Sequence, residues 1–339
     1  MEKLLQEPND LKMKTIAIVA GGYSSEYGIS LKSAEGIYDC IDEKRYHRYI
    51  VLLTNNEWRV QLQDGTISFV DKNDFSFLMN GRKVTFDYAY IIIHGAPGEN
   101  GMLQGYFDML DIPYSSCGVL TSAMTFNKYI NNRFLKSQGF LTADSIRLQS
   151  GQNAPANDII ARLGLPVFVK PNDGGSSFGV TKVKEVAQLQ PAIEKAFAEG
   201  NEVIIERYIE GTEVTCGCYK TKANRVVLPI TEVVTDNEFF DFDAKYNGQA
   251  VEITPARISE ELTAEIQRQT SEIYDVIGAC GIIRVDFIIP KSNRPVILEI
   301  NTNPGMTATS FIPQQIKAAG LDMKAVMTDI IENGWSKKC

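Results

Sequence analysis

Two strand-like segments near the C-terminal end of the chain bring together side chains whose oxygen atoms face one another. The segments lie on either side of Pro-Lys-Ser-Asn-Arg-Pro in GIIRVDFIIPKSNRPVILEINTNPG, residues 281–305, and predict a hairpin. If six residues close this hairpin, Ile289 faces Val296. The same register places Asp286 directly opposite Glu299, so that two carboxylates meet on one face of the predicted sheet.

Arg284 and Asn301 face each other beside the two acids, whereas Leu298 is expected on the opposite, apolar face. Carboxylates that face each other across a ladder repel, so we expect positive charge between Asp286 and Glu299. Carboxylate and amide oxygens suit Mg²⁺, which usually takes its remaining ligands from water and nucleotide phosphates. The alternative is an ordinary solvated hairpin face on which Arg284 neutralises both acids.

A glycine- and serine-rich turn, GGSSFG at residues 174–179, joins two other strand-like segments. Glycines allow backbone N–H groups to converge on phosphate oxygens, and serine hydroxyls add donors. Lys170, at the end of the preceding strand, would supply positive charge. No Lys-Ser/Thr pair follows the last glycine, so the turn is not a Walker A loop. The alternative is a plain flexible hairpin.

Two further segments fit a nucleotide site less specifically. The run NEFFDFDAKY, residues 237–246, is too aromatic for a solvated loop and predicts a lid that excludes water. In that lid Lys245 would reach phosphate and Tyr246 would reach substrate, while the alternative is an ordinary loop anchored by its rings. Glu206 and Glu213 flank a turn and can present carboxylates to an adenosine.

The composition limits the classes of partner. The 339-residue chain is long enough for two or three domains of an ordinary globular protein. A formal charge of −8 gives no electrostatic basis for binding nucleic acid or an anionic membrane surface. No apolar run in the sequence approaches a membrane span. Residues 1–12 lack the apolar core of a signal peptide, so we expect a cytoplasmic protein.

Histidine and cysteine usage excludes several kinds of site. The chain has two histidines, His47 and His94, and His94 is the candidate imidazole for catalysis, with a structural histidine as the alternative. Cys216 and Cys218 share one face of a predicted strand but have no CxxC partner, so we expect buried thiols rather than a zinc site. A Ser-His-Asp hydrolase is disfavoured because no GxSxG elbow occurs.

The N-terminal part predicts an α/β domain. Residues 14–20 predict a buried strand that runs into a glycine-rich turn and a helix beginning near Glu26. Residues 88–95 predict a second strand, followed by a helix over 101–110. Ligands bind at the carboxyl ends of strands in such domains, so we expect Glu26 and His94 near the crevice. The remaining segments predict helices near 119–138, 185–199 and 259–279, and strands in FVKP, GVTKV, NEVIIERYI, EVTCGCYKT and RVVLPITEVV.

Five motifs occur in a characteristic order: HGAPGENGMLQG, FVKPNDGGSSFGVTKV, FFDFDAKY, IIRVDF and LEINTNPGMTATS. Together with GGYSSEYGISL near the N-terminus, they closely resemble the D-alanine–D-alanine ligase family of the ATP-grasp superfamily. The resemblance covers nearly everything after residue 14. Its most specific part is LEINTNPGMT with the upstream RVD.

The resemblance implies α/β and α+β architecture, with an N-terminal doubly wound, Rossmann-like domain followed by a two-lobed ATP-grasp fold. The implied parts are a flexible extension over 1–13, an α/β substrate domain over 14–117, and ATP-grasp lobes over 118–210 and 211–339. The implied activity joins two D-alanines through an acyl phosphate at the expense of ATP, for peptidoglycan precursors. Two Mg²⁺ ions, replaceable by Mn²⁺, small-molecule partners (D-alanine and ATP) and a homodimer are also implied.

The resemblance also implies a role for each motif residue. The implied metal ligands are Asp286, Glu299 and Asn301. The implied ATP site consists of Lys128, Lys170, Gly175, Ser176, Ser177, Glu206, Ile209, Glu213, Phe239 and Lys245. The implied contacts to the two D-alanines come from Glu26, His94, Arg284 and Ser310. The implied catalytic groups are Glu26, Ser176 and Tyr246, which link as the lid closes, and Arg284 and the Gly305 amide, which stabilise the oxyanion.

Some positions depart from the family pattern. Asn100 and Asn127 stand where Asp is common, and Phe240 and Phe242 where Tyr is common. None is an implied metal ligand or charged catalytic group, so we expect activity to be retained. A ligase that makes D-alanyl-D-lactate or D-alanyl-D-serine would share every nucleotide residue and is one alternative. A non-catalytic nucleotide-binding regulator is another, although it would be expected to lack Arg284 or a metal ligand.

Overall fold

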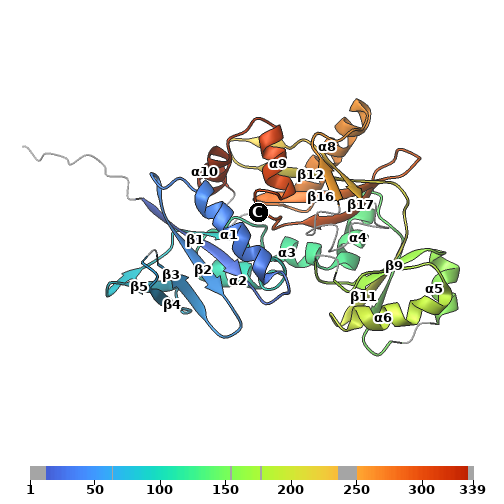
Figure 1. The fold of residues 1–339 in the computed structure, drawn as a ribbon, viewed down its shortest axis with the longest axis horizontal. Coiled ribbons are helices and arrows are strands. Elements are labelled where there is room, and N and C mark those ends of the chain that lie inside the picture. Colours follow the sequence, from blue (N-terminus) through green and yellow to red (C-terminus); the bar gives the residue numbers. More distant parts are fainter. Residues whose placement is uncertain (1–12, 63, 153–154, 176–177, 236–249, 335–339) are drawn as a thin grey trace, which may run out of the picture.

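Three β-sheets with their helices make up the protein (Figure 1). The computed structural model describes residues 13–62, 64–152, 155–175, 178–235 and 250–334. A mixed N-terminal sheet followed by two antiparallel sheets confirms the predicted fold class. Among the helices described, none combines the length and the apolar character needed to cross a membrane.

The first sheet is parallel at one end and antiparallel at the other. Its elements are β1 (Lys14–Gly21), α1 (Tyr27–Cys40), β2 (Tyr46–Leu53), β3 (Trp58–Gln61), β4 (Ile67–Asp71), β5 (Ser76–Met79), β6 (Arg82–Val84), β7 (Tyr88–Ile91) and α2 (Met102–Met109). The strand order is β6-β5-β4-β3-β2-β1-β7, and β2, β1 and β7 are parallel. Alternate residues of β1, such as Ile18 and Val19, enter different cores, as expected for a parallel strand covered on both faces.

The predicted N-terminal elements are present with small changes at their ends. The first strand and the helices α1 and α2 lie where the sequence places them, and Glu26 is the N-cap of α1. The strand predicted over 88–95 ends at Ile91, so His94 lies in the following loop. Four antiparallel strands, β3 to β6, extend the sheet beyond its doubly wound part.

The second sheet is antiparallel and has the order β10-β9-β11-β8. Its elements, with the two helices that lead into it, are α3 (Val119–Phe126), α4 (Lys128–Ser137), β8 (Ser145–Gln149), α5 (Ala156–Leu163), β9 (Val167–Pro171), β10 (Thr181–Val183), a 3₁₀ turn (Val186–Gln188), α6 (Leu189–Phe197) and β11 (Glu202–Arg207). β9 and β10 pair across the glycine-rich turn, which confirms the predicted hairpin. Its buried core lies wholly between Leu148 and Ile205 and is formed by this sheet with α5 and α6.

The third sheet is covered on both faces. Its elements are β12 (Thr212–Lys220), β13 (Arg225–Val227), β14 (Thr231–Thr235), β15 (Ala250–Ile253), α8 (Glu260–Val276), β16 (Ile282–Ile289), β17 (Val296–Asn301), α9 (Phe311–Ala318) and α10 (Met323–Asn333). The order is β15-β14-β12-β16-β17, and β13 also pairs with β12. Ile273 of α8 joins the core on one face, which contains Cys216 and Cys218 as free thiols, as expected.

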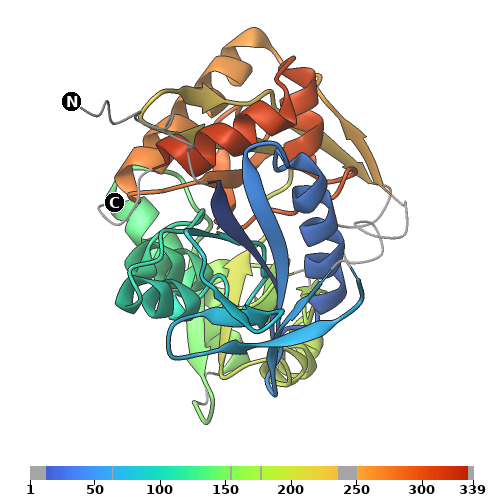
Figure 2. The same cartoon turned by 90° about the vertical axis from the view of Figure 1, so that its left-hand side faces the viewer.

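The other face of the third sheet shares a core with the first sheet. Ile16 of β1 and Ile37 of α1 belong to the same buried cluster as Tyr219 of β12, Ile312 of α9 and Met327 of α10. Figures 1 and 2 both place α1 beside these C-terminal helices. The first and third sheets are therefore joined by continuous packing, whereas the second sheet keeps a core of its own.

The predicted hairpin forms from β16 and β17, but its register is shifted by one residue between Asp286 and the turn. Asp286 faces Glu299 as predicted, while Ile288, rather than Ile289, faces Val296. The register shifts next to Asp286, which is the signature of a β-bulge. The prediction of a six-residue loop is therefore wrong, and Leu298 does not lie on the apolar face where it was expected.

Candidate active site

Two cavities meet at the β16–β17 hairpin. A cavity of about 410 Å³ lies between the second and third sheets. A second one, of about 400 Å³, lies between the third sheet and the loops that follow β1 and β7. Lys128, Gly175, Arg284 and Glu299 line both. A molecule in one cavity can therefore reach a molecule in the other at this junction.

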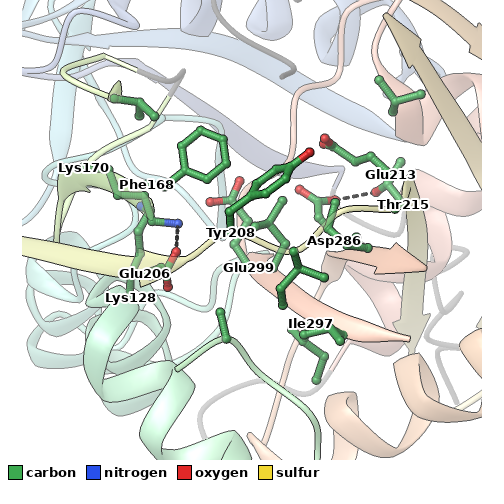
Figure 3. Close-up of a pocket in the computed structure, with 18 of the residues that line it drawn as sticks. Lys128, Phe168, Lys170, Glu206, Tyr208, Glu213, Thr215, Asp286, Ile297 and Glu299 are labelled. Atoms are coloured by element: carbon green, nitrogen blue, oxygen red, sulfur yellow. Dashed lines mark hydrogen bonds and ion pairs between the residues drawn. The ribbon is translucent and has the colours of Figure 1, made fainter. Parts of the chain in front are cut away.

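The first cavity holds a buried ion pair at its inner wall. Lys170 Nζ lies 2.5 Å from Glu206 Oε2, and both side chains are almost fully buried. Burial by itself lowers the pKa of Lys170, but the carboxylates of Glu206, Glu299 and Glu213 together raise it. Asn132 Nδ2 donates to the other Glu206 oxygen at 2.7 Å. Figure 3 shows this pair across the cavity from Thr215 and Asp286.

The same cavity has an aromatic and apolar end. The rings of Phe168 and Tyr208 lie 5.8 Å apart between their centroids, and Ile209 and Leu298 also line the space. Glu213 lines this cavity from the start of β12. Flat apolar walls next to carboxylates suit a purine base and a ribose.

Lys128 and the glycine-rich turn lie where the cavities join. Asn127 caps α4 by accepting from Ile130 N, which places Lys128 at the first turn of that helix. Lys128 Nζ donates to the Gly174 carbonyl at 2.5 Å. Burial lowers the pKa of Lys128, and the Glu299 carboxylate acts in the opposite direction. A Cβ at Gly175 would lie 2.6 Å from Glu26 Oε2, so any larger residue there would require the Glu26 carboxyl to shift.

Asp286 receives donors on both of its oxygens. Arg284 forms two parallel hydrogen bonds with it, from Nε to Oδ1 at 2.8 Å and from Nη2 to Oδ2 at 2.7 Å. Thr215 Oγ1 donates to Oδ1 at 2.6 Å, and Asn301 Nδ2 donates to Oδ2 at 3.1 Å. Glu299 faces Asp286 across the ladder. Arg284 thus brings positive charge to Asp286, and its guanidinium carbon lies 5.2 Å from the centroid of the Phe311 ring.

The donor set of this hairpin fits Mg²⁺. Asp286, Glu299 and Asn301 offer only oxygen atoms as ligands, and both acids line the nucleotide-sized cavity. Within the described part of the chain, no cluster of three His, Cys, Asp or Glu side chains can hold an ion by itself. A bound Mg²⁺ would therefore need phosphate or water oxygens as well, which is its usual mode of binding next to nucleotides.

The second cavity is lined by residues from both ends of the chain. Glu26 and His94 enter it from the first domain, and Gly305 and Ser310 from the loop before α9. His94 is buried, its Nε2 has no hydrogen-bond partner among the described residues, and burial lowers its pKa while Glu26 acts in the opposite direction. Ser310 begins α9, whose N-terminal amides favour an anion such as a carboxylate.

Every implied site residue that the structure describes lines one of these two cavities. The implied residues that lie outside the described ranges are Ser176, Ser177, Phe239, Lys245 and Tyr246. Two family models match the chain: one described as the D-ala D-ala ligase N-terminus, over residues 15–117, and one described as its C-terminus, over residues 134–332. The chain belongs to the D-alanine–D-alanine ligase family.

Related proteins match this ligase along nearly their whole length. The D-alanine–D-alanine ligases of Parabacteroides distasonis and Bacteroides fragilis are 66% and 61% identical to it, over 94% of this chain and 97% and 99% of theirs. Among solved structures, the VanG D-Ala:D-Ser ligase from Enterococcus faecalis is 31% identical, with a TM-score of 0.84 over 94% of this chain and 99% of its own. The Bacillus anthracis D-alanine–D-alanine ligase complexed with ATP is 28% identical, with a TM-score of 0.75 over 94% and 97%.

Two departures of this ligase from the family pattern have local explanations. Asn100 Oδ1 accepts from Met102 N at 3.2 Å at the start of α2, and Asn127 caps α4. Asn and Asp are about equally good at capping a helix, so the change of residue keeps both contacts.

Sequence reasoning missed several polar residues of this ligase's site. Thr215 and Asn132 contact Asp286 and Glu206, but they come from β12 and α4, far from their partners in the chain. Glu99 lines the second cavity, and its Oε2 accepts from Gly95 N at 2.7 Å. The acidic residue in APGENG was the available signal for Glu99, because such loops border the crevice.

Proposed function

We propose that this enzyme uses ATP to join two D-alanines into D-alanyl-D-alanine, a precursor of peptidoglycan. The observation that carries the proposal is the junction of the two cavities at Arg284 and Glu299. One cavity has the walls of a nucleotide site, and the other has an acid, Glu26, and a helix N-terminus for the charged ends of amino acids. Family membership supports the same reaction.

The first step would transfer phosphate across the junction. A carboxylate is a poor electrophile, so an oxygen of the first D-alanine attacks the terminal phosphorus of ATP, ADP leaves, and an acyl phosphate forms. Lys128 and Lys170 contribute positive charge along the phosphate path. Asp286, Glu299 and Asn301 would hold Mg²⁺, two ions in our proposal with Mn²⁺ as a substitute, which neutralises charge on the phosphates. Glu26 holds the ammonium of the first D-alanine.

The second step would form the peptide bond. The amine of the second D-alanine, once it has lost a proton, attacks the acyl carbon, and inorganic phosphate leaves. Arg284, at the junction, and the Gly305 amide, in the second cavity, would stabilise the oxyanion that develops, while Ser310 would hold the second carboxylate. Water must be excluded because it would hydrolyse the acyl phosphate. We propose that Tyr246, Ser176 and Glu26 join in a hydrogen-bonded chain when the site closes.

The decisive experiment measures phosphate release with ATP, Mg²⁺ and a panel of D- and L-amino acids, with the product identified by mass. We expect release to require D-alanine and the product to be the dipeptide. D-lactate and D-serine compete with D-alanine in the same assay at pH 7. If either is incorporated as readily as D-alanine, the enzyme belongs to the depsipeptide-forming or D-serine branch instead. ATP turnover without any joined product would favour a regulator.

Three broader features belong to the same proposal. The domain boundaries would fall at 14–117, 118–210 and 211–339, which agrees with the three sheets. The reaction would take place in the cytoplasm, where ATP is available. The enzyme would act as a homodimer through exposed apolar side chains on two neighbouring helices, namely Met102 and Met109 of α2 and Val119 and Leu120 of α3.

A further inference from the structure

The loop after β7 closes on itself around one acidic side chain. Gly98 N and Glu99 N both donate to the Gly95 carbonyl, at 2.9 and 2.8 Å. Glu99 Oε2 accepts from Gly95 N at 2.7 Å, so the carboxyl ties the two ends of the loop together. His94 directly precedes this loop and projects into the second cavity. The position of His94 therefore depends on a small ring of contacts centred on Glu99.

Asn303, which follows the edge strand of the third sheet, contacts both ends of this loop. Asn303 Nδ2 donates to the Gly98 carbonyl at 2.9 Å, across 205 positions of sequence. The same Asn303 Nδ2 also lies 3.5 Å from the Ile93 carbonyl oxygen, which precedes His94. Asn303 is 5% exposed, and it follows the metal-site residue Asn301 by two positions.

The surroundings of Glu99 show that this carboxyl is not a solvated surface charge. Burial raises its pKa to about 8, with Glu26 acting in the same direction. The Gly95 and Asn303 amides and the Lys128 ammonium act in the opposite direction. A polar group in such surroundings is costly unless its hydrogen bonds are made, and here the Gly95 amide makes one.

We propose that Glu99 and Asn303 form a latch between the loop after His94 and β17. The latch fixes the position of the proposed site for the first D-alanine relative to β17, which carries the proposed metal ligands. The inference deepens the proposed function, on which it rests. Glu99 and Asn303 are then positioning residues, because they act through His94 and Asn301 rather than on the reacting atoms.

The reason such a latch matters is geometric. In the proposed reaction the ammonium of the first substrate would be held by Glu26 of the N-terminal domain, whereas the phosphoryl group that its carboxylate attacks would lie against β17. Misplacement by about 1 Å can cost about 10²-fold in rate even when binding is retained. A loosened latch should therefore lower kcat while leaving nucleotide binding intact. A purely structural contact would instead lower thermal stability and leave kcat of the folded fraction unchanged.

The test is a double-mutant cycle on the full-length enzyme with Glu99→Ala, Asn303→Ala and the two combined. We expect each single change to lower kcat by about 10- to 100-fold, with the KM for ATP and the affinity for a non-hydrolysable ATP analogue within about twofold of wild type. Because both residues belong to one latch, the double variant should be no slower than the slower single variant. Multiplied effects in the double variant would overturn the proposal.

Two further variants keep the test decisive. Glu99→Gln retains an oxygen acceptor for the amides, so we expect it to keep at least about a third of wild-type kcat. Equal losses of kcat in Glu99→Gln and Glu99→Ala would show that the charge of Glu99 matters rather than its hydrogen bonds. That result would overturn the proposal. Glu35→Ala, on the exposed side of α1, is the control. Unfolding midpoints show whether each variant is folded at the assay temperature. If Asn303→Ala is not folded, the comparison of Glu99→Gln with Glu99→Ala decides the test. Absence of dipeptide with wild type would instead overturn the proposed function.

Discussion

Asp286 accepts hydrogen bonds on both of its carboxylate oxygens, and Glu299 faces it from the next strand. Arg284 binds both Asp286 oxygens side-on, and Thr215 and Asn301 each bind one. An ion that enters here must share or displace these donors, and Glu299 would supply the second carboxylate. The two acids are therefore not equivalent, and Glu299 can be changed with the contacts of Asp286 left in place.

We expect Glu299→Gln to abolish turnover without disturbing the fold, because an amide cannot replace the second carboxylate at a Mg²⁺ site. Phosphate release with ATP and D-alanine measures turnover, and Mn²⁺ binding in the presence of an ATP analogue measures metal affinity directly. Glu210→Gln, on the exposed turn after β11, is the matched control. Release at the wild-type rate by Glu299→Gln at ordinary Mg²⁺ would disprove the assignment.

Glu99 also predicts how stability changes with pH. Its pKa is raised from 4.5 to about 8 in the folded protein, so between these values the folded state holds a proton that the unfolded state has lost. This carboxyl therefore opposes folding increasingly as pH rises through that window, and no further above it. We expect the unfolding midpoint of wild type to fall relative to that of Glu99→Gln between pH 5 and pH 8. Parallel profiles for the two proteins would contradict the raised pKa.

The two acids of the hairpin were predictable from the sequence because strand alternation is a local rule. Thr215 was not, because its contact with Asp286 depends on the pairing of β12 with β16, which joins residues 71 positions apart. The contact of Asn303 was even harder to predict, because its partner Gly98 belongs to another domain. Local patterns show which side chains share a face, but packing decides what lies opposite that face.

At the scale of elements, α1 connects two ends of the substrate cavity. Glu26 lies at its N-terminus, and Gly36, in its third turn, touches the loop that carries Gly305 and Ser310. A Cβ at Gly36 would lie 2.7 Å from the Met306 carbonyl oxygen. The helix can approach this loop so closely only because the side chain is missing.

We expect Gly36→Ala to push the Met306 loop away and to lower kcat/KM for D-alanine by about tenfold. Alanine is the better helix former by about 1 kcal/mol, so the loss of activity should not come with a comparable loss of stability. Gly28→Ala in the same helix is the control, because nothing lies within 4 Å of its added Cβ. Equal activity of the two variants would show that the loop tolerates the displacement.

Long periodic segments were predicted well, whereas short strands and the bulge were not. The helices α1 and α8 carry several turns of amphipathic pattern and lie close to where the sequence placed them. The strands β3 to β6 have three to five residues each, which is too few for a clear alternation. The bulge at Leu298 was missed because LEI alternates regularly in the sequence, and only pairing with β16 shows the shift.

At the scale of the whole molecule, α2 and α3 carry exposed apolar side chains. Met109 and Leu120 are 81% and 79% exposed. Clustered apolar side chains of this kind often mark an interface. We expect light scattering at micromolar concentration to give twice the chain mass of 37.7 kDa. Met109→Glu combined with Leu120→Glu should give the monomer mass, whereas Leu78→Glu, at an exposed site on β5, should not. A dimer that survives the double change would place the interface elsewhere.

The second sheet keeps a core separate from the core that the first and third sheets share. The first and third sheets share packed side chains, so the substrate pocket, the acid pair and Arg284 stay in one frame. Lys170 and the glycine-rich turn belong to the other body, whose interior ends at Ile205. Rotation of that body would open the nucleotide cavity and would also move Gly175 away from Glu26 in the substrate cavity. Release of ADP would then be coupled to exposure of the dipeptide.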